Sequence, residues 1–307
     1  METETLLDKY ALVGIVILNW NKVDETLNCL ESLSNLSYPN QKVILVDNGS
    51  TDNSLERFRE YDPNLEILET GKNLGYAEGN NIGIRHILKY QPEYVFVINN
   101  DVRVAEDSLG SLVAEAENNR NAAFLGPKVY HLEEPQTIQS AGVELDYLWR
   151  SKQRGLDQID DGLYTSVESV DCVIGAAVLI RCEHLDQIGL LDPDFFLYRE
   201  DIDWCLRAKN SGFQVLYVPQ AKVWHRGHKV RDSELPRITY YLSRNSLMLI
   251  SRHRGGVIRF LMLLMRYLVT AFSWTIKPKW RHKRQERDAL IKGITDYFQG
   301  RIGFGYE

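Results

Sequence analysis

Short apolar runs alternate with segments of helical periodicity along the first hundred residues. Four apolar runs predict β-strands, at residues 11–18, 41–46, 65–68 and 94–98. The first run, ALVGIVIL, is continuously apolar, as in a strand buried on both faces. Between these runs, residues 23–36 and 79–89 carry leucine and isoleucine at spacings of three and four, which predicts helices. This alternation predicts an α/β fold whose mostly parallel sheet is flanked by helices.

A mixed pattern continues to about residue 230. Helices are predicted at residues 106–118 and near 201–210. Strands are predicted at residues 122–129, 170–180, 214–218 and 221–224. We therefore expect one domain over residues 1–230, with a first half to about residue 104 and a second half from about 105 to 230.

Residues 231–307 differ in character and predict a basic, partly amphipathic helical extension. The apolar segment 256–276 is interrupted by Arg259 and Arg266, whose spacing of seven places both on one helix face. Its longest uncharged stretch, residues 267–276, is too short to span a bilayer, which needs about 20 residues. Tryptophan and basic residues flank the segment: Arg252, Arg254, Trp274, Lys277, Lys279, Trp280, Arg281, Lys283, Arg284 and Arg287.

That arrangement is typical of a helix lying on an anionic membrane surface. The alternative is a helix packed on the rest of the chain or on a second copy, as in a homodimer.

The two parts of the chain also differ in charge. Residues 1–230 hold 21 Lys+Arg and 36 Asp+Glu, a formal charge of −15, whereas residues 231–307 hold 15 and 6, a charge of +9. An acidic body excludes a nucleic-acid binder that is basic throughout.

The cysteines and the amino terminus bear on the compartment. The 4 cysteines are widely spaced, without zinc-binding spacing, and lie among apolar or helical residues, which predicts reduced, buried thiols. The amino-terminal residues are acidic and lack the basic region of a secretory signal. We expect a cytoplasmic protein associated through its basic extension with the inner face of the plasma membrane.

Each predicted strand of the first half is followed by polar side chains. Asn19, Asp47, Asn73 and Asn99 stand at or beyond these strand ends. Ligands of open α/β sheets bind beyond the carboxyl ends of the strands, so these residues form a candidate site. Asp47 in VDNGSTD can accept a hydrogen bond from a ring N–H, although a plain turn with a capping aspartate would have the same sequence.

Two further segments contain candidate metal ligands. The carboxylate and amides of Asn99-Asn100-Asp101 can hold a divalent cation through oxygen, with phosphates completing the shell. His225 follows a predicted strand and can bind metal through a neutral imidazole. The alternatives are an Asx turn for the first segment and a structural histidine for the second.

Two segments favour binding and acid–base chemistry. NLGYAEGNNIG, residues 73–83, places glycine and amides at a helix start, where backbone can approach an anionic ligand, but it lacks the GxGxxG spacing of a nicotinamide site. FFLYREDID, residues 195–203, sets acids beside a hydrophobic wall, where a carboxyl can gain proton affinity and act as a base. An ordinary acidic helix start is the alternative for the second segment.

The order of these segments matters more than any one of them. Across about residues 12–250, LNWN, VDNGSTD, NLGYAEGNNIG, INNDV, GAAVLIR, FFLYREDIDWCLR and WHRGH occur in sequence. This set resembles family 2 glycosyltransferases with the GT-A fold, most closely their rhamnosyltransferase-like branch.

The resemblance implies a role for each matching position. Donor binding is implied for Leu18, Trp20, Asp47, Gly75, Asn81, Asn99 and Asn100. Asp101 and His225 would bind Mg²⁺ or Mn²⁺, and Asp201 would be the catalytic base. Gly175 and Glu200 are candidates on the acceptor side. Asn99 departs from the family's metal motif, where an aspartate is common, and removes one anionic ligand.

The resemblance implies an inverting glycosyltransferase of cell-surface polysaccharide synthesis. Its donor would be a dTDP- or UDP-linked sugar, with rhamnose as one candidate, and its acceptor a hydroxyl of a saccharide or lipid-linked saccharide. A catalytically silent binding protein of the same fold is one alternative, because of Asn99. A sugar nucleotidyltransferase is another, disfavoured because residues 18–22, LNWNK, offer no glycine-rich phosphate loop.

Overall fold

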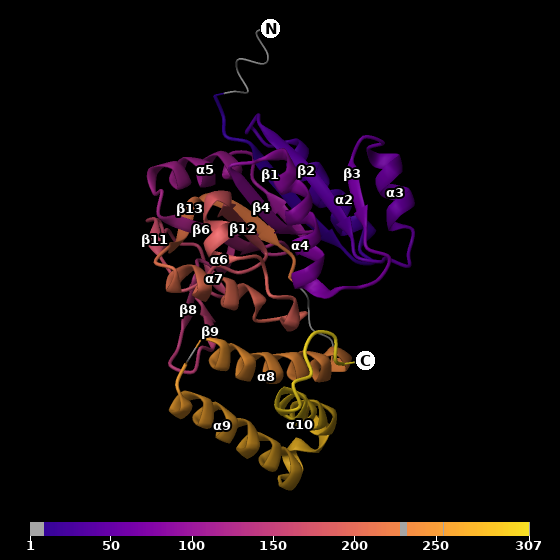
Figure 1. Cartoon of the computed structure of the whole chain (residues 1–307), viewed down its shortest axis with the longest axis vertical. Coiled ribbons are helices and arrows are strands. Elements are labelled where there is room, and N and C mark those ends of the chain that lie inside the picture. The colour runs from indigo at the N-terminus through magenta and orange to yellow at the C-terminus, as the bar shows by residue number, and fades with distance from the viewer. Residues whose placement is uncertain (1–8, 228–231, 254, 307) are drawn as a thin grey trace.

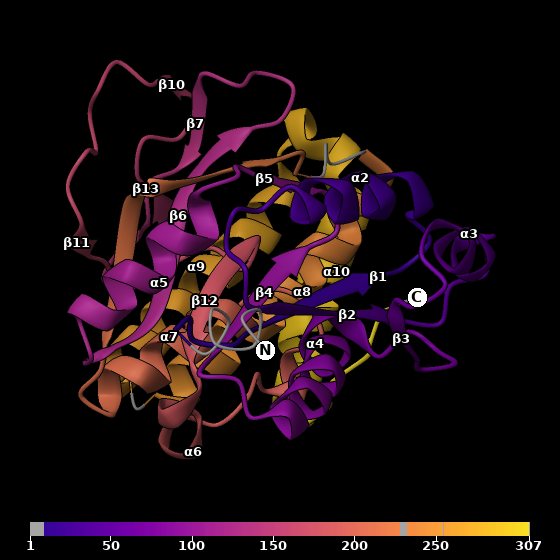
Figure 2. The ribbon, with the colours of Figure 1, turned by 90° about the horizontal axis from the view of Figure 1, so that it is seen from above.

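The computed structural model describes residues 9–227, 232–253 and 255–306 (Figure 1). The expected boundary between residues 230 and 231 and the basic residue Arg254 lie outside these ranges. Within them, an 11-stranded mixed sheet forms the centre of the fold, in the order β10-β7-β6-β12-β4-β1-β2-β3, with β5, β11 and β13 branching from it. Figure 2 shows β3 with α3 at one side of the molecule and β7 with β10 at the other.

The first half of the chain forms the parallel core that the sequence predicted. Its strands are β1 (Val13–Asn19), β2 (Gln41–Asp47), β3 (Glu66–Glu69) and β4 (Tyr94–Asn99), with all three adjacent pairs parallel. Its helices are α2 (Val23–Ser34), α3 (Ser54–Tyr61) and α4 (Gly75–Ile87), followed by the 3₁₀ turn η1 (Leu88–Tyr90). Helix α4 starts at Gly75, four residues before the predicted position 79, and the Gly75 N–H donates to Asn73 Oδ1 at 2.8 Å.

The second half of the sheet is largely antiparallel. Its strands are β5 (Val102–Val104), β6 (Ala122–His131), β7 (Thr137–Ser140), β10 (Gln158–Ile159), β11 (Glu168–Ser169), β12 (Ala177–Arg181) and β13 (Gln214–His225). Strand β12 lies antiparallel between β4 and β6, whereas β13 is parallel to β6. A separate hairpin joins β8 (Val143–Leu145) and β9 (Ser151–Gln153).

Two strand predictions in this half needed correction. The predicted strands 214–218 and 221–224 are one strand, β13, whose register with β6 shifts between Val218 and Lys222. The predicted strand 170–180 contains the short strand β12 only at its end. The apolar residues before it leave the sheet, where Cys172 makes an isolated bridge with Val143. Because this loop is buried, its sequence is as apolar as that of a strand, which explains the incorrect prediction.

Helices cover both faces of the sheet. Two hydrophobic clusters lie on its opposite faces, one holding Val16 of β1 and the other Ile15 and Ile17, as the alternation of a strand requires. The remaining helices of this part are α5 (Ser108–Asn118), α6 (Leu185–Ile188) and α7 (Glu200–Asn210), with 3₁₀ turns η2 (Cys182–His184) and η3 (Pro193–Phe195). All 4 cysteines are free thiols.

Three long helices form the C-terminal part at one end of the molecule. They are α8 (Leu235–Arg252), α9 (Val257–Ile276) and α10 (Arg284–Phe298), with 3₁₀ turns η4 (Asp232–Glu234) and η5 (Pro278–Lys283). Figure 1 shows α8 between the body of the protein and the other two helices. Leu247 of α8, Leu263 of α9 and Leu290 of α10 belong to one apolar cluster that holds the three helices together.

Candidate functional site

The side chain of Asn19 joins the carboxyl ends of β1, β2 and β4. Its Nδ2 group donates to Asp47 Oδ2 and to Ser50 Oγ, both at 3.0 Å. Its Oδ1 atom accepts from Thr26 Oγ1 at 2.8 Å and from Asn100 Nδ2 at 3.4 Å. Asn19 is fully buried, so this network fixes the edge of the sheet where a ligand is expected. The sequence placed Asn19 at a strand end without assigning it this role.

Asp47 lies at that edge with little exposure of its own. Its Oδ1 atom accepts from the Ser50 N–H at 2.9 Å. Beside it, Leu18 is half-buried and Trp20 is 42% exposed at the end of β1. A side chain on Gly79 would come within 2.7 Å of Leu18, so the glycine allows α4 to lie against this strand end.

The start of α4 connects the strand ends to the loop before α7. Asn48 Nδ2 donates to Gly75 O at 3.1 Å, and Gly75 has a φ of 81°. A Cβ atom at this glycine would lie 2.5 Å from Phe196 O. The neighbouring Tyr76 N–H donates to Phe196 O at 2.7 Å. Gly75 is therefore required both for its backbone conformation and for this close approach.

Asn81, a predicted donor-binding residue, makes side-chain hydrogen bonds with the backbone of Leu191. Its Nδ2 group donates to Leu191 O at 2.7 Å, and its Oδ1 atom accepts from the Leu191 N–H at 3.1 Å. The side chain is buried. Its amide thus fixes the chain before η3, and the observed contacts do not bring it to the strand-end edge.

Strand pairing brings His225 to the predicted metal segment. Because β13 pairs with β5, His225 lies opposite Val102, and its Nε2 atom lies 3.1 Å from Asp101 Oδ1 and 3.4 Å from Asn99 Nδ2. Burial alone would raise the pKa of the Asp101 carboxyl, but the hydrogen bond and charge of His225 hold that pKa below its usual value.

The orientation of His225 suits a metal ligand. Gln139 Oε1 lies 2.6 Å from His225 Nδ1 and accepts a hydrogen bond from its N–H, which leaves Nε2 facing Asp101. Nε2 donates to Asp101 while it carries a proton, and a metal ion that displaced that proton would meet its lone pair. The distance of 3.1 Å between Nε2 and Asp101 Oδ1 matches that between neighbouring ligands of an octahedral Mg²⁺-type ion, about 3 Å.

These residues supply only part of a coordination shell. Across residues 9–227, 232–253 and 255–306, no group of three or more His, Cys, Asp or Glu residues could hold a metal ion. The remaining ligands must come from water or from a bound molecule with hard oxygen atoms, such as a diphosphate. Within that limit, the residues present fit a Mg²⁺- or Mn²⁺-dependent site.

Asp201 lies in the first turn of α7 against the backbone of Gly175. Its Oδ2 atom accepts from the Gly175 N–H at 3.3 Å, and its Oδ1 atom from the Ile202 N–H at 2.8 Å. The Gly175 carbonyl in turn accepts from the Tyr76 hydroxyl at 2.6 Å, which links Asp201 to α4. Burial raises the pKa of the Asp201 carboxyl, although these N–H groups and the charge of Arg199 oppose the rise.

Glu200 precedes Asp201 and is more deeply buried, at 6% exposure. Its Oε2 atom has no hydrogen-bond partner among the described residues. Burial, and then the negative charge of Asp201, raise the pKa of Glu200 from 4.5 to about 8. The two acids line a cavity of about 220 Å³. Its other polar lining comes mainly from Ser151, Gln153, Tyr198 and Arg199.

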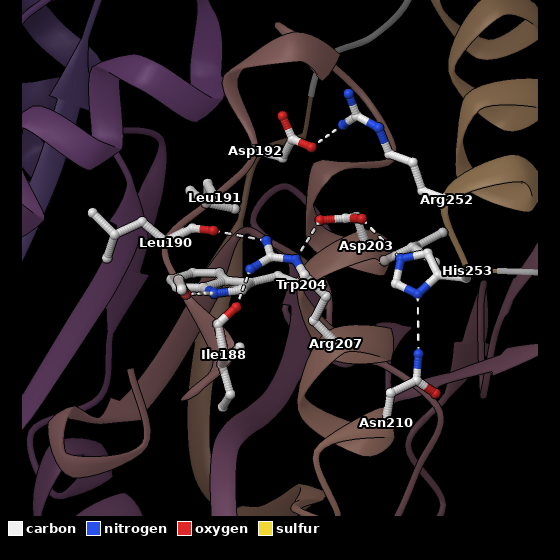
Figure 3. Close-up of polar contacts among 12 residues, drawn as sticks. Ile188, Leu190, Leu191, Asp192, Asp203, Trp204, Arg207, Asn210, Arg252 and His253 are labelled. Carbon is white, nitrogen blue, oxygen red and sulfur yellow. Dashed lines mark hydrogen bonds and ion pairs between the residues drawn. The ribbon is translucent and has the colours of Figure 1, made fainter. Parts of the chain in front are cut away.

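A second polar network, away from the Asp201–Gly175 contact, anchors α7 to the neighbouring loop and to the end of α8 (Figure 3). Arg207 donates to Asp203 Oδ2 at 2.8 Å and to Leu190 O at 2.7 Å. Asp203 also pairs with His253 Nε2 at 2.8 Å, and the same histidine contacts Asn210 through Nδ1. Asp203, one of the three acids in the predicted acidic segment, is therefore a structural residue that ties α7 to the end of α8.

Helix α8 holds the loop that leads into α7. Asn245 Nδ2 lies within donating distance of Phe195 O, Leu197 O and Tyr198 O, at 2.8–2.9 Å. Arg244, also buried, donates to Phe195 O at 3.2 Å. The structure gives the pair a positioning role for the acidic residues of α7.

The predicted site residues thus come from separate elements that meet at one region. Strand ends of the parallel core carry Leu18, Trp20, Asp47, Asn99, Asn100 and Asp101. His225 joins them through β13, and Gly75 connects them to the loop before Glu200 and Asp201. Gly175 contacts Asp201 directly, and Asn81 stands apart in its contacts.

Residues 14–189 match the sequence profile described as glycosyl transferase family 2. The chain is 27% identical over 284 residues to a Mycobacterium tuberculosis N-acetylglucosaminyl-diphospho-decaprenol L-rhamnosyltransferase, covering 86% of this chain and 92% of that protein. It is also 27% identical over 213 residues to the Haloferax volcanii low-salt glycan biosynthesis hexosyltransferase Agl10. That match covers 69% of this chain but 65% of the archaeal protein.

A solved structure supports the fold. The mannosyltransferase PcManGT from Pyrobaculum calidifontis, in complex with GDP-Man and Mn²⁺, superposes with a TM-score of 0.59 at 14% sequence identity. The superposition covers 95% of this chain and 88% of that one. The GT-A fold expected from the sequence is therefore confirmed.

Proposed function

The chain belongs to glycosyl transferase family 2, and from that premise we propose that it is an inverting transferase of cell-surface polysaccharide synthesis. It would move a sugar from a nucleotide-diphosphate sugar to a hydroxyl of a saccharide or lipid-linked saccharide. One observation carries this proposal: Asp201, a carboxylate of raised pKa, borders a cavity and is linked through Gly175 and Tyr76 to the helix that starts at the strand ends.

The donor would bind across the ends of β1, β2 and β4. Asp47 can accept a hydrogen bond from a pyrimidine ring N–H, which suits a dTDP- or UDP-linked sugar. Leu18, Trp20 and Gly75 would line the donor, together with Asn99 and Asn100. The name of the mycobacterial relative supports rhamnose as a candidate sugar and a lipid diphosphate saccharide as a candidate acceptor.

Asp101 and His225 would hold a Mg²⁺ or Mn²⁺ ion with the donor. When bound, such an ion neutralises charge on the diphosphate leaving group. Gln139 would keep Nε2 of His225 directed at the ion, because its Oε1 atom accepts a hydrogen bond from the Nδ1–H group. The presence of Mn²⁺ with GDP-Man in the archaeal neighbour supports this proposal.

Asp201 would act as the general base. Its carboxylate accepts the proton of the acceptor hydroxyl, whose oxygen forms a bond to the anomeric carbon. The bond from that carbon to the diphosphate oxygen breaks on the opposite face, and its electron pair leaves with the nucleoside diphosphate. A single displacement of this kind inverts the anomeric configuration and needs no enzyme nucleophile.

Glu200 would bind the acceptor from within the cavity. With a pKa of about 8, its carboxyl holds a proton at neutral pH and can donate a hydrogen bond to an acceptor oxygen. Gly175 would lie beside this space, because its N–H donates to Asp201. A Cβ atom there would lie 3.0 Å from the Tyr76 hydroxyl and 3.6 Å from Asp201 Cβ, so a larger residue would crowd the Tyr76 hydroxyl and only touch the base.

A screen of nucleotide sugars with Mn²⁺ tests the proposal. A donor that binds the folded state raises its melting temperature with the logarithm of the donor concentration over Kd. We expect one pyrimidine-linked donor to stand out and to release its nucleoside diphosphate only with metal and acceptor present. Donor binding without metal-dependent release of nucleoside diphosphate would favour the catalytically silent alternative. That alternative rests on Asn99, which stands where an aspartate is common in the family's metal motif.

A further inference from the structure

Helix α9 has one face packed on the protein and one face open. Leu263 and Ala271 are buried in the apolar cluster shared with α8 and α10, and Phe260, Tyr267 and Trp274 pack at its margin. On the opposite side, large apolar side chains are exposed, by 48% at Leu268 to 70% at Ile258. We call these residues the α9 stripe: Ile258, Leu261, Met262, Met265, Leu268, Val269, Phe272 and Ile276.

The α9 stripe is continuous. Its members recur at spacings of three and four along the whole helix, so they form one band rather than scattered contacts. The helix lies at the lower end of the molecule in Figure 1, with α8 between it and the sheet. An apolar band of this length on a soluble surface marks a site of interaction.

The charged residues of the helix lie outside the stripe. The Arg259 guanidinium lies 4.5 Å from the Trp149 ring centre and 4.8 Å from that of Tyr147, which places this side chain on the β8–β9 hairpin side of the helix. Arg266, one heptad later, shares that side. The stripe itself carries no charge, so it matches an apolar partner.

A basic turn follows the end of the stripe. Lys277, Lys279 and Arg281 are exposed at and within η5. Lys279 lies 5.1 Å from the Trp280 ring centre, and Lys283 lies 5.5 Å from that of Trp274 on α9. Tryptophan with lysine and arginine beside an apolar helix face is the composition found where protein meets an anionic bilayer surface.

We propose that the α9 stripe and the basic turn together form a docking surface for a bilayer that contains anionic lipid. The helix lies in the plane of the interface, with its stripe among the acyl chains near the headgroups and the turn against lipid phosphates. The cytoplasmic leaflet of the plasma membrane has this charge. This inference does not depend on the proposed transferase chemistry, but it would place the enzyme beside a lipid-linked acceptor.

An interfacial position fits the packing better than a transmembrane one. By length and composition α9 is the one helix among the described residues that could cross a membrane. A crossing helix would have to withdraw Leu263 and Ala271 from their cluster with α8 and α10, and Arg259 from its aromatic partners. Docking on one face leaves all of these contacts intact.

Sedimentation of the full chain with vesicles tests the proposal without donor or acceptor. We expect binding to vesicles of phosphatidylcholine with phosphatidylglycerol, weaker binding to phosphatidylcholine alone, and weakening at high salt. The double variant Met265→Glu/Phe272→Glu should lower the partition coefficient by at least about 100-fold, because it removes two large apolar contacts. Ile159→Glu, at a 70% exposed apolar position on β10, is the matched control and should bind normally.

A second variant separates charge from apolar contact. Replacing Lys277, Lys279 and Arg281 by glutamine should lower binding to the anionic vesicles by about 100-fold and leave binding to phosphatidylcholine nearly unchanged. All variants should unfold thermally like the wild type, since the changed side chains are exposed.

Three results would overturn the proposal. Unchanged vesicle binding by both variants would show that another surface docks. Resistance of the membrane-bound protein to alkaline carbonate extraction would indicate a transmembrane helix. A homodimer in solution that Phe272→Glu dissociates, with no vesicle binding by the wild type, would identify a second copy as the occupant of the stripe.

Discussion

The Nε2 atom of His225 lies 3.1 Å from Oδ1 of Asp101, on a strand that returns to the sheet late in the chain. Gln139 sets the orientation of this pair, because it accepts from Nδ1 of the same ring at 2.6 Å. The pair is the part of the site that depends most on tertiary structure.

Gln139→Leu should weaken Mn²⁺ binding without removing either ligand. Losing the partner of a metal-binding histidine typically costs about 10–100-fold in metal affinity, because the ring loses its fixed orientation. Calorimetric titration of Mn²⁺ into the protein with nucleoside diphosphate measures the change. Gln136→Leu, at an exposed position nearby, is the control, and equal affinity in both variants would contradict this role for Gln139.

Asp201→Asn should stop transfer while leaving donor binding intact. The amide cannot accept the acceptor proton, and loss of a general base costs about 10²–10⁴-fold in rate. Single-turnover release of nucleoside diphosphate measures the rate, and thermal shift with donor and Mn²⁺ measures binding. Asp186→Asn, exposed on α6, should behave as wild type. Lost donor binding or near-normal turnover in Asp201→Asn would remove Asp201 from the role of base.

Glu200→Gln should flatten the dependence of stability on pH. The pKa of Glu200 is about 8 in the folded state against 4.5 ordinarily, so the folded protein keeps a proton that the unfolded chain releases. Between these values, rising pH favours unfolding by about 1.4 kcal/mol for each pH unit. Below pH 4.5 both states are protonated and no stability is lost.

Glutamine has no proton to release, so the variant should lose less stability than wild type between about pH 5 and pH 8. Urea unfolding across this range measures the free energy of unfolding. Glu144→Gln, exposed on β8, provides the comparison. Parallel curves for wild type and Glu200→Gln would show that Glu200 titrates normally.

Gly75→Ala should lower the melting temperature of the protein more than Gly71→Ala. Both glycines have positive φ, 81° and 72°, so alanine at either position carries the same backbone strain of about 1–2 kcal/mol. Only at Gly75 does the added Cβ also meet Phe196 O, at 2.5 Å, whereas Gly71 has open space. We expect a larger fall in melting temperature, and loss of donor binding, in Gly75→Ala alone. Matching losses in both variants would assign the effect to φ rather than to the contact.

Local patterns predicted the parallel half of the fold well. The four strands from β1 to β4 lie within one or two residues of the apolar runs, since all four are short and β1, β2 and β4 are largely buried. The polar residues at their ends were also predicted to form one site, because parallel strands bring their carboxyl ends to one edge of the sheet. The antiparallel insertion of β12 and the single long strand β13 were not predicted, since strand direction leaves no local periodic signal.

The sequence by itself therefore determined the alternation of elements, the candidate chemistry at the strand ends and the apolar character of α9. Only the tertiary structure decided that Asp101 meets His225, that the Asp201 carboxylate rests on Gly175, that Asn81 serves the loop at Leu191, and which face of α9 stays open. The physical reason is the distance along the sequence over which each effect acts. Periodicity and propensity act within a few residues, whereas these contacts depend on how distant strands pair and on which helix face the core has already covered.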